Sequence, residues 1–502
     1  MRNTECNLPI EILALVLDVF RRSLPPREFF RTISRCSRTS KLFYAVCSPY
    51  FFHYGVQIGT PAMDRRRIFH HRVSPILERC PSAEVYIQSL AYNYDFYQPK
   101  EVALHSLSAP NVLQLPNVTS ISIRCDGAHA LFRGSLDADG RGVFPVERKS
   151  YRLLLEQNMT AQTVTDLSFA HIRQIPSEVI LLLPSLKSLK FQFCSMINSP
   201  SLSTTTLESS MTCFAATYTD FDPSFFRHCP NLEKLDVQGA NPKSNGLAVP
   251  LTNAAILHDF CNLIEISTDC TLPWEKFLPP EPNSLFQNLR KLCIQLDDDG
   301  AKEVITGLLD RLSSLKCLSV DMDTVKLDTD IDLTRHLKSW RQSLQKMNFT
   351  WRKNNDTQLK VLCDALDLDP RRSTCVTPAA LQSLELHTSL DLLNHDNIFD
   401  HDAEQWKRLD AILGRIDAFP LLSCVGLHIN VNRICREIRQ DLSSDLTKEW
   451  VVQYVQDWLG QIPLKNLMDS SKRPTLKTTT DVTSFALMFP GRDGDDLLDT
   501  TL

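Results

Sequence analysis

Glycine is scarce in this chain of 502 residues, which contains only 15, less than half of the usual share of about 7%. The sequence has no G-x-G-x-x-G and no G-x-x-x-x-G-K-[ST] motif, the loops that hold the phosphates of dinucleotides and nucleotides. It also lacks an apolar run of about 18 residues, the length that spans a bilayer. These absences argue against a nucleotide-dependent enzyme and against a membrane-spanning protein.

Paired cysteines and a signal peptide are missing as well. The 16 cysteines stand singly, for example at Cys194, Cys293 and Cys424, which is typical of buried thiols in a reducing compartment. The first apolar stretch contains Glu11 and Asp18 and is not followed by a small-residue cleavage site, unlike a secretory signal. We therefore expect a protein of the cytoplasm, the nucleus or both, without membrane association.

Candidate chemistry is sparse. A polar cluster at 395–402 contains Asp and His without the spacing of a zinc site such as H-E-x-x-H. The acidic run at 297–300 lacks the alternating oxygen ligands of a calcium loop. No Ser/His/Asp or Cys/His arrangement has a recognisable signature. We expect no enzymatic activity, no metal and no cofactor.

The N-terminal stretch LPIEILALVLDVF at 8–20 predicts an amphipathic helix. Its apolar residues recur at helical spacing and are expected on one face: Leu8, Ile12, Leu13, Val16, Leu17 and Phe20. A lone helix of this length is marginal in water. The predicted apolar face must therefore pack against another surface.

Two further helices are predicted in the next residues, one around Phe29–Cys36 and one around Leu42–Cys47, the latter ending at Ser48-Pro49. Together the three segments make a helical unit at 1–55. The opening Leu8-Pro9-Ile10-Glu11-Ile12-Leu13, followed by apolar positions, and the later segment Cys36–Phe43 resemble the F-box family.

The resemblance implies a partner and a site. F-boxes dock on an adaptor of the Skp family, which links them to a cullin and a RING subunit. The residues of this chain expected in the F-box core or at the adaptor contact are Leu8, Pro9, Ile12, Leu13, Val16, Leu17, Leu42 and Phe43. An ordinary N-terminal helix that packs on the following domain is the alternative.

The distribution of charge agrees with an acidic partner. Residues 1–80 contain 13 Lys and Arg against 6 Asp and Glu, whereas the rest contains 41 against 53. Skp-family adaptors are acidic, so a basic N-terminal unit suits them. A nucleic-acid patch at Arg65-Arg66-Arg67 is a weaker alternative, since three arginines are little evidence for one.

A short pattern, apolar-x-x-apolar-x-apolar, recurs after residue 80. Its copies begin at Val118, Val164, Leu186, Leu232, Leu263, Leu289, Leu315, Leu344, Leu381 and Leu422. The last two apolar positions alternate as in a half-buried strand, and helical stretches such as 179–183, 302–312 and 359–366 lie between copies. The pattern is the strand signature of a leucine-rich repeat.

The array resembles the degenerate leucine-rich repeats that follow many F-boxes, particularly in fungi. The fold class is therefore α/β: a small helical unit, then an irregular solenoid with a curved parallel sheet and helices on its outer face. Two gaps of 46 residues, after 118 and after 186, conceal either a missed repeat or an insertion. A non-repeat α/β domain is the alternative.

The predicted organisation has four parts. They are the F-box unit at 1–55, a linking helix at 56–80, the repeats at 81–465 and a partly disordered tail at 466–502. Within them we expect a helix at 65–80, a strand at 83–88 and an amphipathic capping helix at 445–459.

These features predict the substrate-recognition subunit of an SCF-type ubiquitin ligase, acting in protein degradation through protein–protein interaction. The chain would perform no bond chemistry but would hold a target close to the ubiquitin-loaded enzyme. The target would bind the repeats or the long segments at 192–220, 238–260 and 388–405. The alternative is a leucine-rich-repeat scaffold that acts outside a ubiquitin ligase. The sequence does not identify the target or the signal for its binding.

Overall fold

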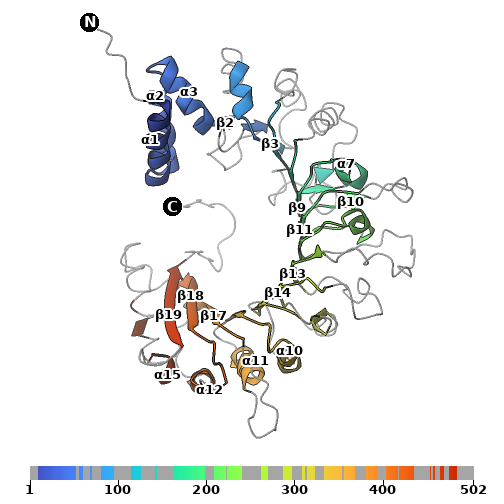
Figure 1. Cartoon of the computed structure of the whole chain (residues 1–502), viewed down its shortest axis with the longest axis vertical. Helices are drawn as coiled ribbons and strands as arrows, with labels where there is room; N and C mark the ends of the chain where they lie inside the picture. Colours follow the sequence, from blue (N-terminus) through green and yellow to red (C-terminus); the bar gives the residue numbers. More distant parts are fainter. Residues whose placement is uncertain are drawn as a thin grey trace, which may run out of the picture. The chain divides into compact units, whose positions relative to one another are not determined.

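The computed structural model contains two compact units, Met1–Leu263 and Ile264–Leu502, whose elements are labelled in Figure 1. The structure describes residues 9–52, 56–59, 68–69, 81–94, 115–125, 142–143, 163–173, 175–181, 183–197, 208–221, 223–239, 262–269, 286–296, 308–310, 312, 314–322, 333–352, 356–367, 380–392, 403–415, 418–434, 453, 456–457, 464–468 and 474–482. Each unit is considered by itself.

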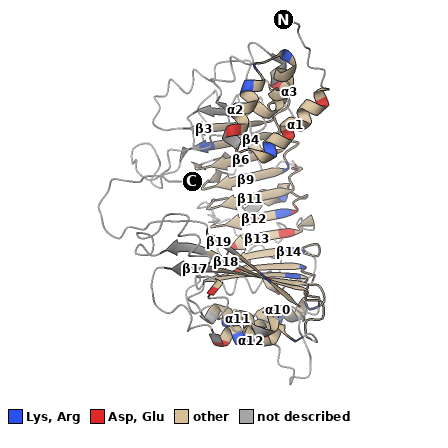
Figure 2. Ribbon diagram, turned by 90° about the vertical axis from the view of Figure 1, so that its left-hand side faces the viewer, with Lys and Arg blue, Asp and Glu red and all other residues tan. Residues whose placement is uncertain are grey.

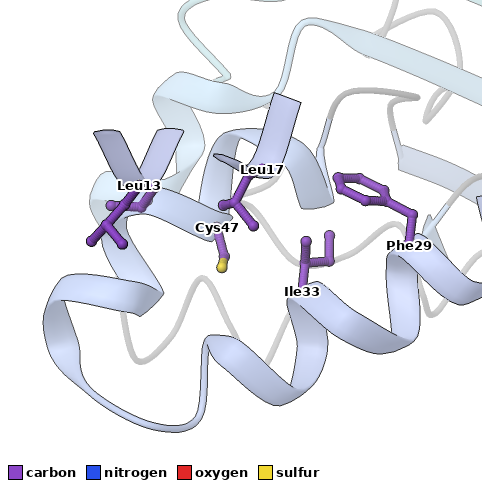
Figure 3. Packing of buried hydrophobic residues seen from close by; sticks show 6 residues of the cluster. Leu13, Leu17, Phe29, Ile33 and Cys47 are labelled. Atoms are coloured by element: carbon purple, nitrogen blue, oxygen red, sulfur yellow. The ribbon is translucent and has the colours of Figure 1, made fainter. Parts of the chain in front are cut away.

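The first unit begins with three helices, α1 (Ile10–Ser23), α2 (Pro26–Cys36) and α3 (Lys41–Phe51). Their shared core consists of Leu13, Leu17, Phe29, Ile33, Val46 and Cys47, most of which Figure 3 shows. The Tyr50 hydroxyl donates a hydrogen bond to the Ala14 carbonyl at 3.0 Å, which joins α3 to α1. The predicted helical unit is thus present as a packed bundle.

The ends of these helices differ in detail from the prediction. Helix α3 continues through Pro49 to Phe51 rather than ending at Ser48. It begins at a Ser40 cap, whose hydroxyl accepts a hydrogen bond from the Phe43 amide at 3.2 Å. Proline removes only one intrahelical hydrogen bond, and the buried residues Val46 and Cys47 hold this helix against its neighbours.

The rest of the first unit is built on a parallel sheet, whose strands lie in rows in Figure 2. In spatial order they are β2 (Ile68–Phe69), β1 (Val56–Gly59), β3 (Ser89–Tyr94), β4 (Ser120–Cys125), β6 (Asp166–Ala170), β9 (Ser188–Gln192), β11 (Cys213–Thr217) and β12 (Lys234–Gln238). Short elements beside them are η1 (Pro81–Tyr86), β5 (Gly142–Val143), β7 (Ile172–Arg173), β8 (Ile175–Pro176), α7 (Ser177–Leu181), β10 (Met196–Ile197) and η5 (Pro223–His228).

The second unit continues the same design. Its strands, in spatial order, are β13 (Glu265–Asp269), β14 (Lys291–Gln295), β15 (Cys317–Asp321), β16 (Lys346–Arg352), β17 (Ser383–Leu392), β18 (Cys424–Ile434) and β19 (Thr475–Val482). Helices α10 (Leu333–Ser339), α11 (Asp356–Leu366), α12 (Ala403–Leu413) and α15 (Lys465–Met468) lie on one side of this sheet (Figure 1). The predicted α/β class with a parallel sheet is confirmed in this form.

The repeat pattern locates the strands precisely. Each of the ten predicted copies is followed by a strand that begins two residues after its first apolar position, as Leu289 precedes β14 and Leu344 precedes β16. That first residue is buried, and in eight of the ten copies the next two amides share one carbonyl of the preceding repeat. The amides of Gln345 and Lys346, for example, both donate to the Lys316 carbonyl, at 2.8 and 3.0 Å.

Two local predictions in the first unit are wrong, and one alternative left open by the sequence is decided. Val56–Gly59 and Ile68–Phe69 are strands β1 and β2 rather than parts of a linking helix at 56–80 with its helix at 65–80, and the remainder of that segment lies outside the described residues. Pro81–Tyr86 is a 3₁₀ helix rather than a strand, since the strand begins at Ser89. The segment 192–220 contains strand β11, so the second long gap conceals a missed repeat.

The first long gap has the other explanation, an insertion. Strand β4 pairs directly with β6 in parallel, with Ile121 beside Leu167. Within the described part of the gap, Gly142–Val143 pairs with β7 in a separate two-stranded sheet. The gap after Val118 therefore adds no rung to the main sheet.

The tail is more ordered than predicted where it is described. Thr475–Val482 forms β19, which pairs in parallel with β18 through eight residues, so the sheet extends beyond residue 465. Of the predicted helix at 445–459, only Gln453, Gln456 and Asp457 are described, and all three are helical and exposed. The apolar face predicted for that helix lies outside the described residues.

Candidate docking surface on helix α1

Helix α1 has apolar residues on two faces. Leu13 and Leu17 are 7% and 4% exposed and belong to the bundle core. Ile12, Leu15, Val16 and Val19 are 43%, 61%, 42% and 54% exposed, and their spacing of three, four and seven residues places them on one face of the helix. We call these four residues the outer stripe.

The outer stripe is the main apolar surface of the bundle. Phe20, four residues after Val16, extends it by one turn and is also exposed. Ile10 at the start of α1 and Leu42 at the start of α3 are further exposed large side chains. Single exposed apolar residues are common, but a contiguous group is typical of an interaction surface.

The polar surface of the bundle is mainly basic. Among the described side chains of the helices and the turns between them, the exposed basic residues are Arg22, Arg31, Arg35, Arg38 and Lys41. The exposed acidic residues there are Glu11 and Glu28, while Asp18 lies 3.8 Å from Arg21 in an ion pair. A partner of acidic surface would complement this distribution.

Burial raises the pKa values of two titratable groups in the core of the bundle. Desolvation, with a smaller contribution from Cys36, raises the pKa of the Cys47 thiol to about 11. Burial and then Asp18 raise the pKa of Tyr50, whose neutral hydroxyl donates to Ala14. Both groups therefore stabilise the bundle as neutral side chains, and Cys47 is no nucleophile.

The structure divides the predicted site residues into two groups. Leu13 and Leu17 belong to the core, and Phe43 is half-buried against it. The exposed members are Pro9, Ile12, Val16 and Leu42. Leu8 lies outside the described residues.

The sequence analysis missed Leu15 and Val19, the two most exposed members of the outer stripe. The single face predicted for α1 combined residues of both faces, because nearly every position between Ile10 and Phe20 is apolar. This excess of apolar residues is visible in the sequence and indicates more than one apolar face. A helix that is apolar on both faces needs two partners, and the bundle supplies only one of them.

The other clusters considered in the sequence provide no site among the described residues. The cluster at 395–402 and the acidic run at 297–300 lie outside the described residues. In the part of the chain that is described, no group of three or more His, Cys, Asp or Glu side chains could hold a metal ion. Among the same residues, no helix combines the length and apolarity needed to cross a membrane.

The comparisons with known proteins give no family for this chain. A scan against protein-family models finds no match, and a search of curated proteins also finds none.

Proposed function

We propose that the three-helix bundle is an F-box-type module that docks on an acidic Skp-family adaptor. The chain would then be the substrate-recognition subunit of an SCF-type ubiquitin ligase, linked through the adaptor to a cullin and a RING subunit. The observation that carries the proposal is the outer stripe, an apolar helix face that the bundle leaves exposed.

Burial of the outer stripe would contribute part of the free energy of association. Complete burial of one large aliphatic side chain contributes about 1.5–3 kcal/mol. The four stripe residues are roughly half exposed, so their burial would contribute on the order of 4 kcal/mol. Basic side chains elsewhere on the bundle would add electrostatic steering toward an acidic partner.

The repeats would provide the surface for the target. Parallel strands present alternate side chains outward in each unit, and these vary from one strand to the next, from Ser267 to Asn348 to Glu385 along one row. Such a row is a ready scaffold for recognition of another protein. A repeat scaffold that works outside a ligase uses the same surface, and the outer stripe favours the ligase because it supplies a second docking site.

Co-purification of the full chain with a Skp-family adaptor tests the proposal. The wild-type chain should form a stable complex, and Leu15→Asp should abolish it because a carboxylate would be desolvated at the interface. Leu421→Asp is the matched control, since Leu421 is 55% exposed and lies in the second unit.

Two outcomes of this experiment would contradict the proposal. A folded wild-type chain that fails to retain the adaptor would refute the ligase role and favour the scaffold. Equal retention of the wild-type and Leu15→Asp chains would show that the outer stripe is not the docking surface.

A further inference from the structure

A hydroxyl, an imidazole and a carboxylate are connected in series across three strands of the second unit. His428 on β18 lies between Glu385 on β17 and Thr479 on β19. Its Nε2 is 2.9 Å from Glu385 Oε2, and its Nδ1 is 2.6 Å from Thr479 Oγ1. These residues stand 43 and 51 positions apart in the chain, so no local motif could reveal them.

The carboxylate determines which nitrogen of His428 can act as a base. A carboxylate only accepts hydrogen bonds, so the proton of the neutral ring lies on Nε2 and is donated to Glu385. Nδ1 then has a free lone pair directed at Thr479, whose hydroxyl donates to it. This is the arrangement of a nucleophile, a base and a group that orients the base.

Gly426 makes room for this arrangement. A Cβ atom at Gly426 would lie 1.7 Å from Glu385 Oε2 and 2.8 Å from Glu385 Cδ. The carboxylate of β17 therefore reaches His428 only because the neighbouring position on β18 has no side chain. Ser383 donates a second hydrogen bond to Glu385 Oε1 at 3.1 Å and fixes the carboxylate from its own strand.

Groups on both neighbouring strands flank the His428 side chain, which is 35% exposed. The His387 ring stacks on it with centroids 4.4 Å apart, and burial is the main cause that lowers the pKa of His387, so an uncharged ring covers this side at neutral pH. Thr479 is exposed, and Lys477 lies two residues before it on the same strand face.

We propose that Thr479, His428 and Glu385 form an acyl-transfer site that accepts carboxylic esters. Thr479 Oγ would attack the ester carbonyl while His428 Nδ1 takes its proton, and the Lys477 ammonium would stabilise the oxyanion. Collapse breaks the carbonyl–alkoxy bond, and the proton passes from His428 to the leaving alcohol. Water, deprotonated by His428, then attacks the acyl-threonine; the carbonyl–Oγ bond breaks, the carboxylic acid leaves, and His428 returns the proton to Thr479 Oγ.

This site belongs to the second unit and is independent of adaptor docking by α1. It adds an activity that the sequence analysis did not expect. Because the site lies on an outward sheet face, substrates would reach Thr479 directly from solvent.

The full chain treated with p-nitrophenyl acetate provides the test. We expect release of p-nitrophenolate together with acetylation of Thr479, detected by mass spectrometry of its peptide. His428→Gln should slow acetylation of Thr479 about 10²-fold, the lower end of the usual contribution of a general base. Thr479→Val should abolish that modification.

Two further variants test whether the Thr479 hydroxyl is activated by His428 and Glu385 or reacts like any exposed hydroxyl. Thr478→Val should leave the rate unchanged, because Thr478 is also exposed but lies in the adjacent row beside Leu427. Gly426→Ala should slow Thr479 acetylation by displacing Glu385, with amide hydrogen exchange of β18 confirming that the strand persists. Two outcomes would overturn the proposal: acetylation of Thr479 no faster than that of Thr478, or an acetylation rate that does not change in His428→Gln. Either result would show that the three side chains only form hydrogen bonds between strands.

Discussion

Adjacent positions of α1 have opposite roles. Leu17 is in the core of the bundle, whereas Val16 and Val19 face outward. A polar substitution is therefore expected to affect folding at Leu17 and the proposed docking at Val16 or Val19. An adaptor-binding test must use the outer stripe, because changes at Leu13 or Leu17 would unfold the surface under test.

Leu17→Ala should destabilise the bundle by about 2–5 kcal/mol, the usual cost of removing a buried leucine side chain. Leu15→Ala, at an exposed position, should change the stability by less than about 0.5 kcal/mol. Amide hydrogen exchange of α1 to α3 in the full chain measures both effects. Equal loss of protection in the two variants would contradict the assignment of faces.

Three aromatic residues in the first unit adopt an unusual backbone conformation. His171, Phe193 and Tyr218 directly follow β6, β9 and β11, and all have positive φ, from 48° to 58°. Bulky residues rarely adopt this region, at a cost of about 1–2 kcal/mol each. Their rings stack at 5.0 and 4.9 Å, and each stacked pair returns about 0.5–1.5 kcal/mol. Stacking thus offsets part of the strain.

Gly239 occupies the corresponding position after β12, with a φ of 59°. Gly239→Ala should destabilise β11 and β12 by about 1–3 kcal/mol, because a Cβ there would lie 2.3 Å from the Tyr218 ring. Hydrogen exchange of the two strands measures this loss. The double variant Gly239→Ala, Tyr218→Ala should recover the steric part, and a neutral single variant would refute the close packing.

At the scale of elements, most strands of the main sheet could be predicted from the sequence, whereas several segments between and beside them could not. Leu, Ile and Val at the pattern positions define a rung because their burial requires a fixed register with the next strand. Strand β11 was overlooked although Met211-x-x-Phe214-x-Ala216 fits the pattern and all three residues are buried, because it contains no leucine, isoleucine or valine at these positions.

Strand β19 lacks the apolar-x-x-apolar-x-apolar pattern. Its described side chains are mainly polar and exposed, and backbone hydrogen bonding to β18 holds it in place. The sequence shows that α1 is apolar on more than one face, but it does not show which of these residues α2 and α3 cover.

Asp410 links two elements near the end of the second unit. It is buried on α12, and its carboxylate accepts hydrogen bonds from the Asn466 and Leu467 amides, at 3.0–3.1 Å, at the start of α15. Asp410→Ala should leave these donors without an acceptor and destabilise α15 by about 1–3 kcal/mol. Asp410→Asn should cost less, because one acceptor oxygen remains. Hydrogen exchange at 464–468 measures both, and unchanged protection in Asp410→Ala would contradict this role.

The region of β17 to β19 should lose stability in acid. Burial lowers the pKa of His387 from 6.5. Burial alone would raise the pKa of Glu385, but hydrogen bonds from His428 and Ser383 outweigh it and lower that pKa from 4.5. In both cases the unfolded chain binds the proton more readily, so stability present above the unfolded pKa is lost as the pH falls through the folded value.

Loss of protection in these strands should therefore begin as the pH falls below about 6.5 and continue below about 4.5. Hydrogen exchange of β18 across this pH range, corrected for the intrinsic exchange rate, measures it. His387→Gln should remove the earlier part and leave the later one. Protection that increases on acidification would show that the two shifts have the opposite sign.

At the scale of the molecule, the chain combines a basic helical bundle with two units of parallel strands. The repeats bury their apolar rows within each unit, whereas the bundle leaves the outer stripe on its surface. That difference supports the proposed division of labour, in which the bundle docks on an acidic adaptor and the strands carry the surface for the target.

Calorimetric titration of the full chain with a purified Skp-family adaptor tests this central claim most directly. We predict saturable binding with a negative heat-capacity change, because apolar surface is buried. Affinity should fall at least about tenfold, or about 1.4 kcal/mol, in Leu15→Asp and stay unchanged in Leu421→Asp. No binding by the folded wild-type chain, or equal affinity of the Leu15→Asp chain, would contradict the claim.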